Sequence, residues 1–348
     1  MSTATSRAPG TVETAAPRAD ARAPRSRRPR LLSVVAPAYN EEEGLPKFVE
    51  EVRRVLPPLA DDYEILIVDD GSRDGSRAVL ARLEAEEPHL RWLSLSRNFG
   101  HQAALVAGLE NARGDVVITM DSDLQHPPAL LPEMVARWRE GNDVVFTTKA
   151  ASSRGFSSTR RMMMKGGYAV LRFVSGLNLT FGQSDFRLLD RSVVDALIAM
   201  PERDKFLRGL IHWVGFRQTG IEYQVGERFA GAEKYTLRQL LHLVTTGVFS
   251  FTILPLRLFT GFGVTIALLS MVYGVAAVIA GGIALATRNP ALSPPGWATL
   301  TAAITFLGGV QLIGIGLLGE YVGRIYDEAK RRPTYVVGFR SGESAKEP

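Results

Sequence analysis

Three clusters of acidic and polar residues have the composition of a site that binds a metal ion and a phosphorylated substrate. Pro37–Glu41, Asp69–Ser72 and Asp121–Gln125 each come directly after a short run of apolar residues. If these runs are parallel strands, the three clusters meet at one edge of a sheet. Carboxylates held so close together repel one another unless a cation or hydrogen-bond donors neutralise them. The clusters are therefore candidates for chemistry, because folding alone does not require them.

The triplet Asp121-Ser122-Asp123 is the candidate metal site. In an extended segment or a turn, alternate residues present two carboxylates to the same side. Such hard oxygen ligands suit Mg²⁺ or Mn²⁺, which complete their coordination shells with water and substrate phosphates. Two acids separated by one residue occur by chance in many loops, so the prediction depends on the neighbouring clusters. Asp69 and Asp70 have a second interpretation, since they also suit the capping of the helix that follows them.

The apolar runs alternate with segments of helical period, which predicts an α/β fold with a mainly parallel sheet. Right-handed crossover connections then place the candidate site at the carboxyl ends of the strands. The expected strands are Leu31–Ala36, Tyr63–Val68, Arg91–Leu95, Asp115–Met120 and Asp143–Phe146. The expected helices lie near residues 44–56, 75–87, 101–112 and 129–140.

Two long stretches without charged residues predict a transmembrane hairpin. No charged residue lies between Arg257 and Arg288, and none lies between Arg288 and Glu320. About 20 apolar residues suffice to cross the hydrocarbon core of a membrane. We therefore expect spanning helices near residues 259–285 and 298–320. A buried pair of helices in a soluble protein is the alternative interpretation.

The charges that flank the hairpin predict its orientation. Basic residues precede the first span and follow the second, whereas the short connection holds only Arg288. The positive-inside rule places both termini and the large domain in the cytoplasm, in a multi-pass protein of the cytoplasmic (inner) membrane. Residues 236–256 are apolar with a few polar positions, so we expect an amphipathic helix at the membrane interface. Residues 257–320 then form the hairpin, and residues 321–348 form a cytoplasmic tail.

The basic balance of the chain comes from its first residues. Residues 1–30 hold seven arginines and two acidic residues, which accounts for the whole net charge of +5. This segment has almost no large apolar side chains, so we expect a disordered basic tail whose arginines are solvated or attracted to anionic lipids. The rest of the chain is neutral, which argues against nucleic-acid binding by the folded part. The absence of cysteine excludes thiolate catalysis, disulfides and cysteine-ligated metals.

The three clusters and several further motifs resemble the family 2 glycosyltransferases, which have the GT-A fold. Arg97–Gly100 and the pair Pro127-Pro128 extend the similarity to this family. Asp185–Arg191 narrows it to the polyprenyl-phosphate glycosyltransferases, the group of dolichol-phosphate mannose synthase. Gly319–Tyr326 is similar to the bacterial branch that has two C-terminal transmembrane helices. The resemblance covers nearly everything outside the basic tail and implies a GT-A domain, with a Rossmann-like sheet, over residues 31–235.

The resemblance implies transfer of a sugar from a nucleotide sugar to the phosphate of a polyprenol, with inversion at the anomeric carbon. Undecaprenyl phosphate is the expected acceptor, UDP-glucose is the first choice of donor and GDP-mannose is the second. The resemblance also implies a metal ion, Mg²⁺ or Mn²⁺, on Asp121 and Asp123, and a reaction centre made by Asp123, Gln125, Asp185 and Arg187. The residues expected around the nucleotide are Pro37, Tyr39, Asn40, Glu41, Asp69, Asp70, Asp121 and Ser122.

A phosphate acceptor is already anionic at neutral pH, so it needs cationic residues that clamp it more than it needs a catalytic base. Asp185 is therefore at least as suited to orienting a sugar hydroxyl, or the Arg187 side chain, as to acting as a base. Each candidate clamp can also be interpreted as an ordinary surface cation. The candidate clamps are Arg154, Arg160, Arg161, Lys165, Arg228 and Lys234.

Three other functions stay open at this point. A processive polysaccharide synthase of the same superfamily usually carries Gln-x-x-Arg-Trp, but Arg137-Trp138 here is preceded by Met134 at the glutamine position. A hydroxyl-directed transferase gives the hairpin and the Asp185–Arg191 motif no clear role. An inactive membrane scaffold does not need the intact acidic residues. The expected partners are the nucleotide sugar, polyprenyl phosphate, membrane lipid and, in a homo-oligomer, further copies of the chain.

Overall fold

The computed structural model describes the chain over residues 11–12, 25, 28–149, 183–203, 205–223, 254–287 and 296–342. The chain divides into two compact units. Residues 1–244 and 333–348 form the first, which we call the sheet unit, and residues 245–332 form the second, which we call the hairpin unit.

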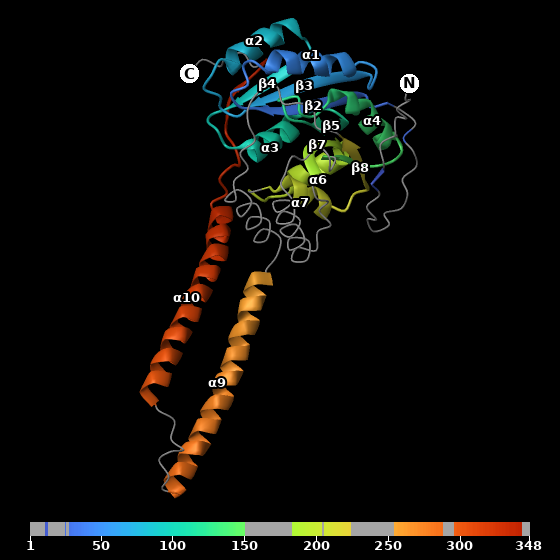
Figure 1. The fold of residues 1–348 in the computed structure, drawn as a ribbon. Coiled ribbons are helices and arrows are strands. Elements are labelled where there is room, and N and C mark those ends of the chain that lie inside the picture. Colours follow the sequence, from blue (N-terminus) through green and yellow to red (C-terminus); the bar gives the residue numbers. More distant parts are fainter. Residues whose placement is uncertain are drawn as a thin grey trace, which may run out of the picture. The chain divides into compact units, whose positions relative to one another are not determined.

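Within the described residues, the strands of the sheet unit form one sheet in the order β1-β8-β6-β7-β5-β2-β3-β4-β9 (Figure 1). The bounds are β1 Thr11–Val12, β2 Leu31–Ala38, β3 Asp62–Asp69, β4 Leu90–Leu95, β5 Val116–Thr119, β6 Val144–Lys149, β7 Gln183–Asp190, β8 Gln218–Tyr223 and β9 Val337–Arg340. β5, β2, β3 and β4 are parallel neighbours, and β6 is parallel to β8. β7 runs antiparallel between β5 and β6, and β1 and β9 add antiparallel edges. The predicted α/β fold with a mainly parallel sheet is confirmed.

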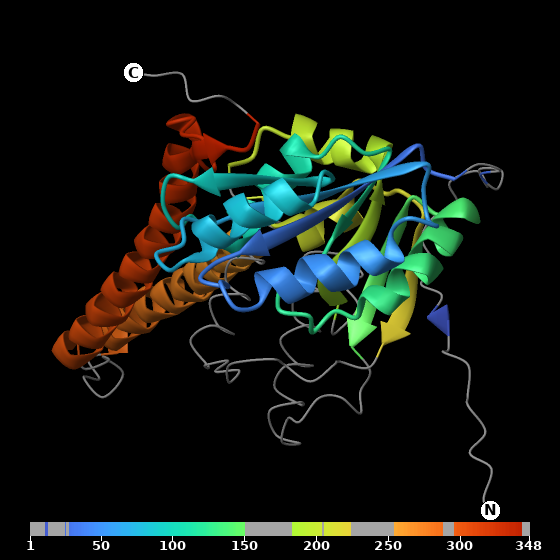
Figure 2. The same cartoon turned by 90° about the horizontal axis from the view of Figure 1, so that it is seen from above.

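Helices cover both faces of this sheet. Their bounds are α1 Leu45–Val55, α2 Ser76–Glu86, α3 His101–Asn111, the 3₁₀ helix η1 Pro128–Leu130, α4 Leu131–Arg139, α6 Arg191–Ala199 and α7 Leu207–Trp213. Apolar side chains of α1, α2 and α4 join one face of the sheet in a single buried cluster. α3 packs on the opposite face, beside α6 (Figures 1 and 2).

The alternation of side chains along β2 decides which residue contacts which layer of helices. Leu32 and Val34 belong to the buried cluster that includes α1, whereas Val35 faces α3. A side chain at Gly108 would collide with Val35, so this glycine lets α3 lie close against the sheet. The close approach fixes the first turn of α3 near the carboxyl ends of the central strands.

The elements predicted for residues 31–149 are confirmed. Each of the five expected strands and each of the four expected helices is present within a few residues of its expected bounds. The elements from β7 to β8 were not expected in any detail, because their residues follow no long periodic pattern. These later elements carry half of the candidate site.

The disorder expected for residues 1–30 stays a prediction, but the described positions of this segment include contacts with the rest of the sheet unit. β1 pairs with β8, and Arg25 lies against the folded part of the sheet unit. The Arg25 guanidinium forms ion pairs with Asp143 at 2.7 Å and with Asp190 at 3.1 Å. An arginine of the basic segment thus pairs with two poorly exposed carboxylates. Composition alone does not reveal such a pairing.

Described residues after 320 belong to regular elements, whereas the cytoplasmic tail expected for residues 321–348 stays a prediction. The helix α10 continues to Ala329, and β9 then extends the sheet along β4. The Ser341 N–H donates to the Trp92 carbonyl at 2.9 Å, and the rings of Phe339 and Trp92 lie 4.6 Å apart. The chain that follows the hairpin is therefore part of the fold of the sheet unit.

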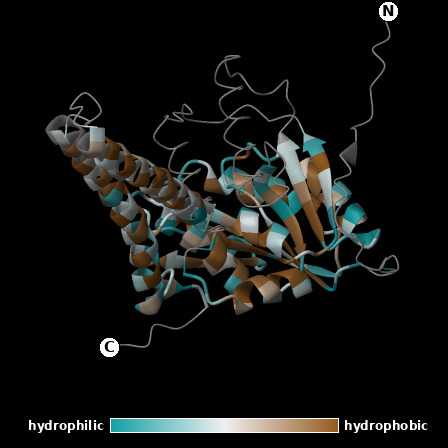
Figure 3. Ribbon diagram, turned by 90° about the horizontal axis from the view of Figure 1, so that it is seen from below, coloured by the Kyte–Doolittle hydropathy of each residue, from teal (hydrophilic) through white to brown (hydrophobic). Residues whose placement is uncertain are grey.

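The hairpin unit consists of α9 Leu254–Thr287 and α10 Gly296–Ala329. By length and composition, Leu256–Ala276 and Phe306–Ala329 are candidate membrane spans, and neither has a buried residue in its most apolar window. This exposure is the opposite of what a buried pair of soluble helices requires, and apolar residues dominate both helices (Figure 3). The expected interfacial helix over residues 236–256 lies almost wholly outside the described residues.

Ending the chain after Arg332 should destabilise the sheet unit although it leaves the hairpin intact. The truncation removes β9, its contact with Trp92 and the hydrogen bond of 2.5 Å from the Tyr335 hydroxyl to Glu110. We expect the midpoint of thermal unfolding to fall by about 5 °C or more. A chain that ends after Gly342 is the matched control and should unfold like the full chain. Equal midpoints for the two truncated proteins would contradict the assignment of β9 to the fold.

Candidate active site

The antiparallel strand β7 brings the Asp185 motif to the same edge of the sheet as the candidate metal site. β7 pairs with β5 so that Arg187 lies opposite Thr119. Because the two strands run in opposite directions, the first residues of β7 lie beside the last residues of β5. The Thr119 hydroxyl donates to the Asp185 carbonyl at 2.6 Å. Asp121 and Asp185, separated by more than sixty residues in the sequence, thus face one site.

The loop that carries the two metal-site aspartates is held in a tight and unusual conformation. The Ser122 hydroxyl donates to the Pro37 carbonyl at 3.0 Å, which ties the loop to the end of β2. The Gln125 N–H donates to Asp123 Oδ1 at 3.1 Å. Leu124 has a φ of +58°, in the left-handed region that a leucine rarely adopts. Backbone strain of this kind persists only where the surrounding contacts enforce it.

His126 supplies one of these contacts from inside the protein. The imidazole is 1% exposed, and its Nδ1 accepts from the Asp121 N–H at 3.1 Å. The proton of the neutral ring therefore lies on Nε2, which donates to the Ser184 hydroxyl at 2.6 Å. His126 thus joins the metal-site loop to the start of β7.

Asp185 is the centre of a network of charges at this edge. The guanidinium of Arg208, at the start of α7, donates to both carboxylate oxygens at 2.8 and 2.7 Å. Burial alone would raise the pKa of Asp185, but the ion pair with Arg208 holds that pKa well below its usual range. His101 Nε2 lies 3.5 Å from both Asp185 and Asp121. Burial lowers the pKa of His101, but these two carboxylates outweigh it, so the pKa is raised.

Asp69 and Asp70 support the site from within the protein. Asp69 is fully buried, and its carboxylate accepts from the Ser72 N–H, the Ser94 hydroxyl and the Arg77 guanidinium. Asp70 accepts from the N–H groups of Phe99 and Gly100 at 2.7 and 2.9 Å, and burial raises its pKa despite these bonds. Asp69 therefore supports the loop that follows β3, and its contact with a nucleotide stays a prediction. Asp70 holds the loop that precedes α3. The motif Arg97–Gly100 forms this loop.

The loop after β2 presents a second set of predicted residues. Asn40 has a φ of +55°. Its N–H donates to the Ser72 hydroxyl at 2.9 Å, and its amide oxygen accepts from the Arg73 N–H at 2.9 Å. The Glu41 N–H donates to the Ser76 hydroxyl at 2.9 Å. These bonds connect the ends of β2 and β3. Tyr39 is 42% exposed on this loop, so its ring is accessible to a ligand.

Arg187 does not reach the open part of the site. It is 2% exposed, and its guanidinium donates to the Ser184 carbonyl at 3.0 Å and to the Gln183 side-chain oxygen at 3.4 Å. The amide nitrogen of Gln183 in turn donates to His212 Nε2 at 3.2 Å. Arg187 is therefore placed to support β7. Its charge also helps to lower the pKa of Asp185, and its role at the reaction centre stays a prediction.

Asp121 and Asp123 fit a divalent cation, but they cannot hold one alone. Asp121 Oδ1 is buried and has no hydrogen-bond partner among the described residues. Over that same part of the chain, no group of three or more histidine, aspartate or glutamate side chains could hold a metal ion. A cation there needs further oxygen ligands from the substrate, as is usual for Mg²⁺ in phosphate sites.

The six predicted acceptor clamps, Arg154, Arg160, Arg161, Lys165, Arg228 and Lys234, all lie outside the described residues. Two other residues of the site, Arg208 and Gln102, were missed in the sequence. Arg208 belongs to a short helix without a motif, and only the folded sheet brings it to Asp185. Gln102 follows the motif Arg97–Gly100 by two residues, and this position is the one signal that could have indicated it.

Comparison with known protein families divides the chain as the structure does. A model described as glycosyl transferase family 2 matches residues 33–198. A second model, described as the GtrB C-terminal hairpin, matches residues 254–325. β9 follows both matched segments.

Curated relatives match over most of the chain. An uncharacterised glycosyltransferase of Synechocystis sp. is 42% identical, over 88% of this chain and 94% of its own. A bactoprenol glucosyl transferase of Shigella phage SfV is 38% identical, over 88% of this chain and 97% of its own. Among solved structures, glucosyl-3-phosphoglycerate synthase from Mycobacterium tuberculosis is 21% identical over 64% of this chain and 79% of its own, with a TM-score of 0.44. A TM-score this low assigns neither a substrate nor a cofactor.

Removing either partner of the Asp185–Arg208 pair should cost more stability than removing both. Arg208→Met leaves a carboxylate that is 9% exposed without its main counter-charge, so we expect a loss of about 3 kcal/mol in the free energy of unfolding. The double variant Asp185→Asn with Arg208→Met should recover part of this loss. Urea unfolding of the four proteins gives the coupling energy. Additive losses would contradict the ion pair.

His212 should make the sheet unit less stable in mild acid. Burial, followed by the charge of Arg187, lowers the pKa of His212 from 6.5 to about 4. The unfolded chain therefore binds a proton between these values that the folded chain does not, and stability falls as the pH decreases through this window, by about 3 kcal/mol at most. His212→Gln should flatten the decrease, as measured by urea midpoints at several pH values. An unchanged slope would show that His212 is not the group responsible.

Proposed function

This chain belongs to glycosyl transferase family 2, and we propose that it moves glucose from UDP-glucose to undecaprenyl phosphate with inversion at the anomeric carbon. It is a polyprenyl-phosphate glycosyltransferase. The observation that carries the choice of glucose is the set of relatives named bactoprenol glucosyl transferase, one of which is 38% identical over 97% of its own length. GDP-mannose is the second choice of donor.

The donor side of the proposal rests on the acidic edge of the sheet. Asp121 and Asp123 would hold Mg²⁺ or Mn²⁺ at the diphosphate, and Gln125 would support Asp123 through their hydrogen bond. When bound, such a cation neutralises charge that develops on the leaving nucleoside diphosphate. The exposed ring of Tyr39 would stack on the base. The remaining nucleotide residues, Pro37, Asn40, Glu41, Asp70 and Ser122, would shape the pocket by bonding its loops to one another.

The acceptor side rests on the chemistry of a phosphate. Its nucleophilic oxygen is already anionic near neutral pH, so the protein has to align it and to balance its charge. Arg208 is a cation at the described edge of the site, although Asp185 balances part of its charge. The carboxylates beside His101 raise its pKa and so favour the protonated ring. The clamps proposed from the sequence, Arg154, Arg160, Arg161, Lys165, Arg228 and Lys234, would supply the rest.

A hydroxyl acceptor is the second candidate, and one observation disfavours it. A sugar hydroxyl needs a base whose pKa is near the working pH. Asp185 is the predicted candidate, but its pKa is held well below the usual range by Arg208. Asp185 is thus a poor proton acceptor and a good anchor for cations and hydrogen-bond donors. The inactive scaffold is disfavoured because this network would have no use in it.

The proposed location is the cytoplasmic membrane, where the long acceptor lipid resides. α9 and α10 would span the membrane, and the excess of basic residues beside them would keep the sheet unit and both termini in the cytoplasm. The interfacial helix over residues 236–256 would lie at the same surface. Association with further copies of the chain is compatible with this arrangement.

A transfer assay tests the proposal. The full chain in detergent, with Mg²⁺ or Mn²⁺ and undecaprenyl phosphate, should form a labelled lipid from radiolabelled UDP-glucose, and EDTA should prevent it. Asp123→Asn should lower the rate at least a hundredfold, which corresponds to about 2.7 kcal/mol, because it removes a charged metal ligand. Asp195→Asn, on an aspartate whose side chain is 63% exposed on α6, is the matched control and should retain full activity.

Each result of the assay has a separate meaning. Lipid product from GDP-mannose alone would replace the donor but keep the class of reaction. Full activity of Asp123→Asn, or in the presence of EDTA, would remove the metal ion from the proposal. Transfer to a sugar hydroxyl without lipid product would overturn the acceptor.

A further inference from the structure

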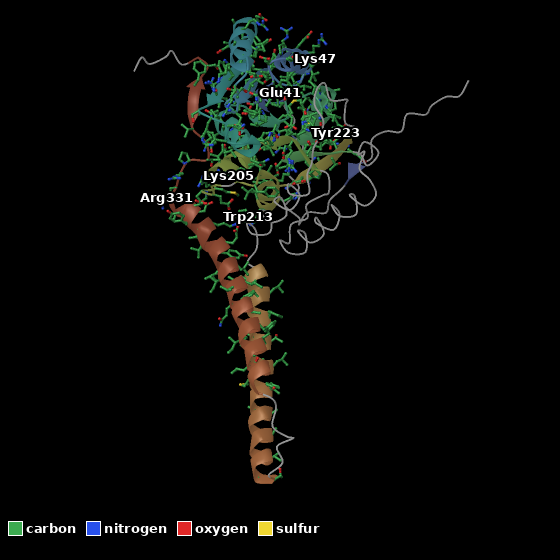
Figure 4. All side chains as sticks on the ribbon, turned by 60° about the vertical axis from the view of Figure 1, so that its left-hand side comes forward. Glu41, Lys47, Lys205, Trp213, Tyr223 and Arg331 are labelled. Atoms are coloured by element: carbon green, nitrogen blue, oxygen red, sulfur yellow. The ribbon has the colours of Figure 1, made fainter. Side chains whose placement is uncertain are left out.

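Two oxygen atoms at the active edge are buried without a hydrogen-bond partner. They are Gln102 Oε1 and Asp121 Oδ1, and Tyr223 Oη (labelled on β8 in Figure 4) is the only further case among the described residues. Buried polar atoms in folded proteins are nearly always bonded, so each exception requires a reason. His101 Nε2 lies 3.5 Å from Asp121 Oδ1, and it also lies 3.5 Å from Asp185. Gln102 is the next residue along α3.

The orientation of the Gln102 amide follows from its neighbour. Its nitrogen lies 3.5 Å from Asp185 Oδ2. A flipped amide would place the amide oxygen against this carboxylate, which would be repulsive. The amide nitrogen therefore faces Asp185, and Oε1 is left as an acceptor whose two lone pairs are unused. The ion pair between Asp185 and Arg208 fixes the carboxylate and so fixes the amide.

The backbone beneath Gln102 is equally fixed. Asp70 binds the N–H groups of Phe99 and Gly100, the two residues that precede α3. Gly108 holds the following turns of α3 against the sheet. Gln102 therefore has little freedom to move away from a ligand, and its acceptor is preorganised.

A lone acceptor selects the chemistry of its ligand. Phosphate and diphosphate oxygens have no proton to donate at neutral pH, so they cannot satisfy Gln102 Oε1. A metal ion would prefer the carboxylates of Asp121 and Asp123. A sugar hydroxyl has the required proton. A nucleotide sugar on Asp121 carries such hydroxyls on its ribose and on the transferred sugar, and the binding of UDP, which has the ribose alone, separates the two.

We propose that Gln102 Oε1 accepts a hydrogen bond from a hydroxyl of the transferred sugar and so contributes to the choice of donor. The inference rests on the proposed function, because it requires a nucleotide sugar at Asp121. It adds a residue of α3 to the recognition of the sugar. Sites that bond a substrate hydroxyl discriminate strongly against analogues that lack it, since the buried acceptor is then left unpaired.

Binding measurements on the full chain in detergent test this role without requiring turnover. The ligands are UDP, UDP-glucose and the UDP-glucose analogues in which fluorine replaces the 3-, 4- or 6-hydroxyl, because fluorine cannot donate a hydrogen bond. The unmodified protein should bind one analogue about tenfold more weakly than UDP-glucose. Gln102→Met should bind UDP-glucose about tenfold more weakly and should no longer distinguish that analogue. Its affinity for UDP should stay within about twofold.

The proposal is overturned if Gln102→Met discriminates among the analogues as the unmodified protein does, or if it weakens UDP as much as UDP-glucose. A protein that prefers GDP-mannose would overturn the donor assignment alone. The same comparison with deoxyfluoro analogues of GDP-mannose would then decide the role of Gln102.

Discussion

The site depends on keeping one nearly buried carboxylate ionised. Asp185 is 8% exposed, and an unpaired charge in such a place would cost several kcal/mol. Arg208 meets this requirement with two hydrogen bonds, and the charge network then extends to His101 and, through it, to Asp121. The start of α3 and the start of α7 thus both supply residues to this network. The contacts that stabilise the buried charge of Asp185 thus also position the residues that would face the substrates.

The topology of the sheet makes this network possible. Parallel strands place the residues that follow β2, β3 and β5 at one edge of the sheet. Only an antiparallel strand can bring the beginning of a strand to that same edge. The antiparallel insertion of β7 adds Asp185 and the residues that support it beside the end of β5. His126 then bonds both the backbone of Asp121 and the hydroxyl of Ser184. The metal-site loop and β7 are therefore held as one body, which suits a reaction that needs two substrates in line.

The sequence was sufficient to predict the first half of the sheet unit and insufficient for the second half. β2 to β6 carry local signals, because apolar runs and helical periods are properties of neighbouring residues. Arg25, Arg208 and β9 contact partners far along the chain, and no local period reports such contacts. The chemical types of the clusters were predicted better than their roles. Asp69 has the right type and place for a ligand contact, but three internal hydrogen bonds occupy it.

The attachment of β9 ties the chain that follows the hairpin unit to the helix that carries part of the candidate site. The chain leaves the sheet unit before α9 and returns to it after α10, where Thr334 bonds the Arg203 carbonyl and Tyr335 bonds Glu110 of α3. Glu110 lies at the end of α3, and His101 and Gln102 lie at its start. The returning chain and the candidate site therefore share one helix of the sheet unit, so a change at this attachment acts on the element that would face the substrates.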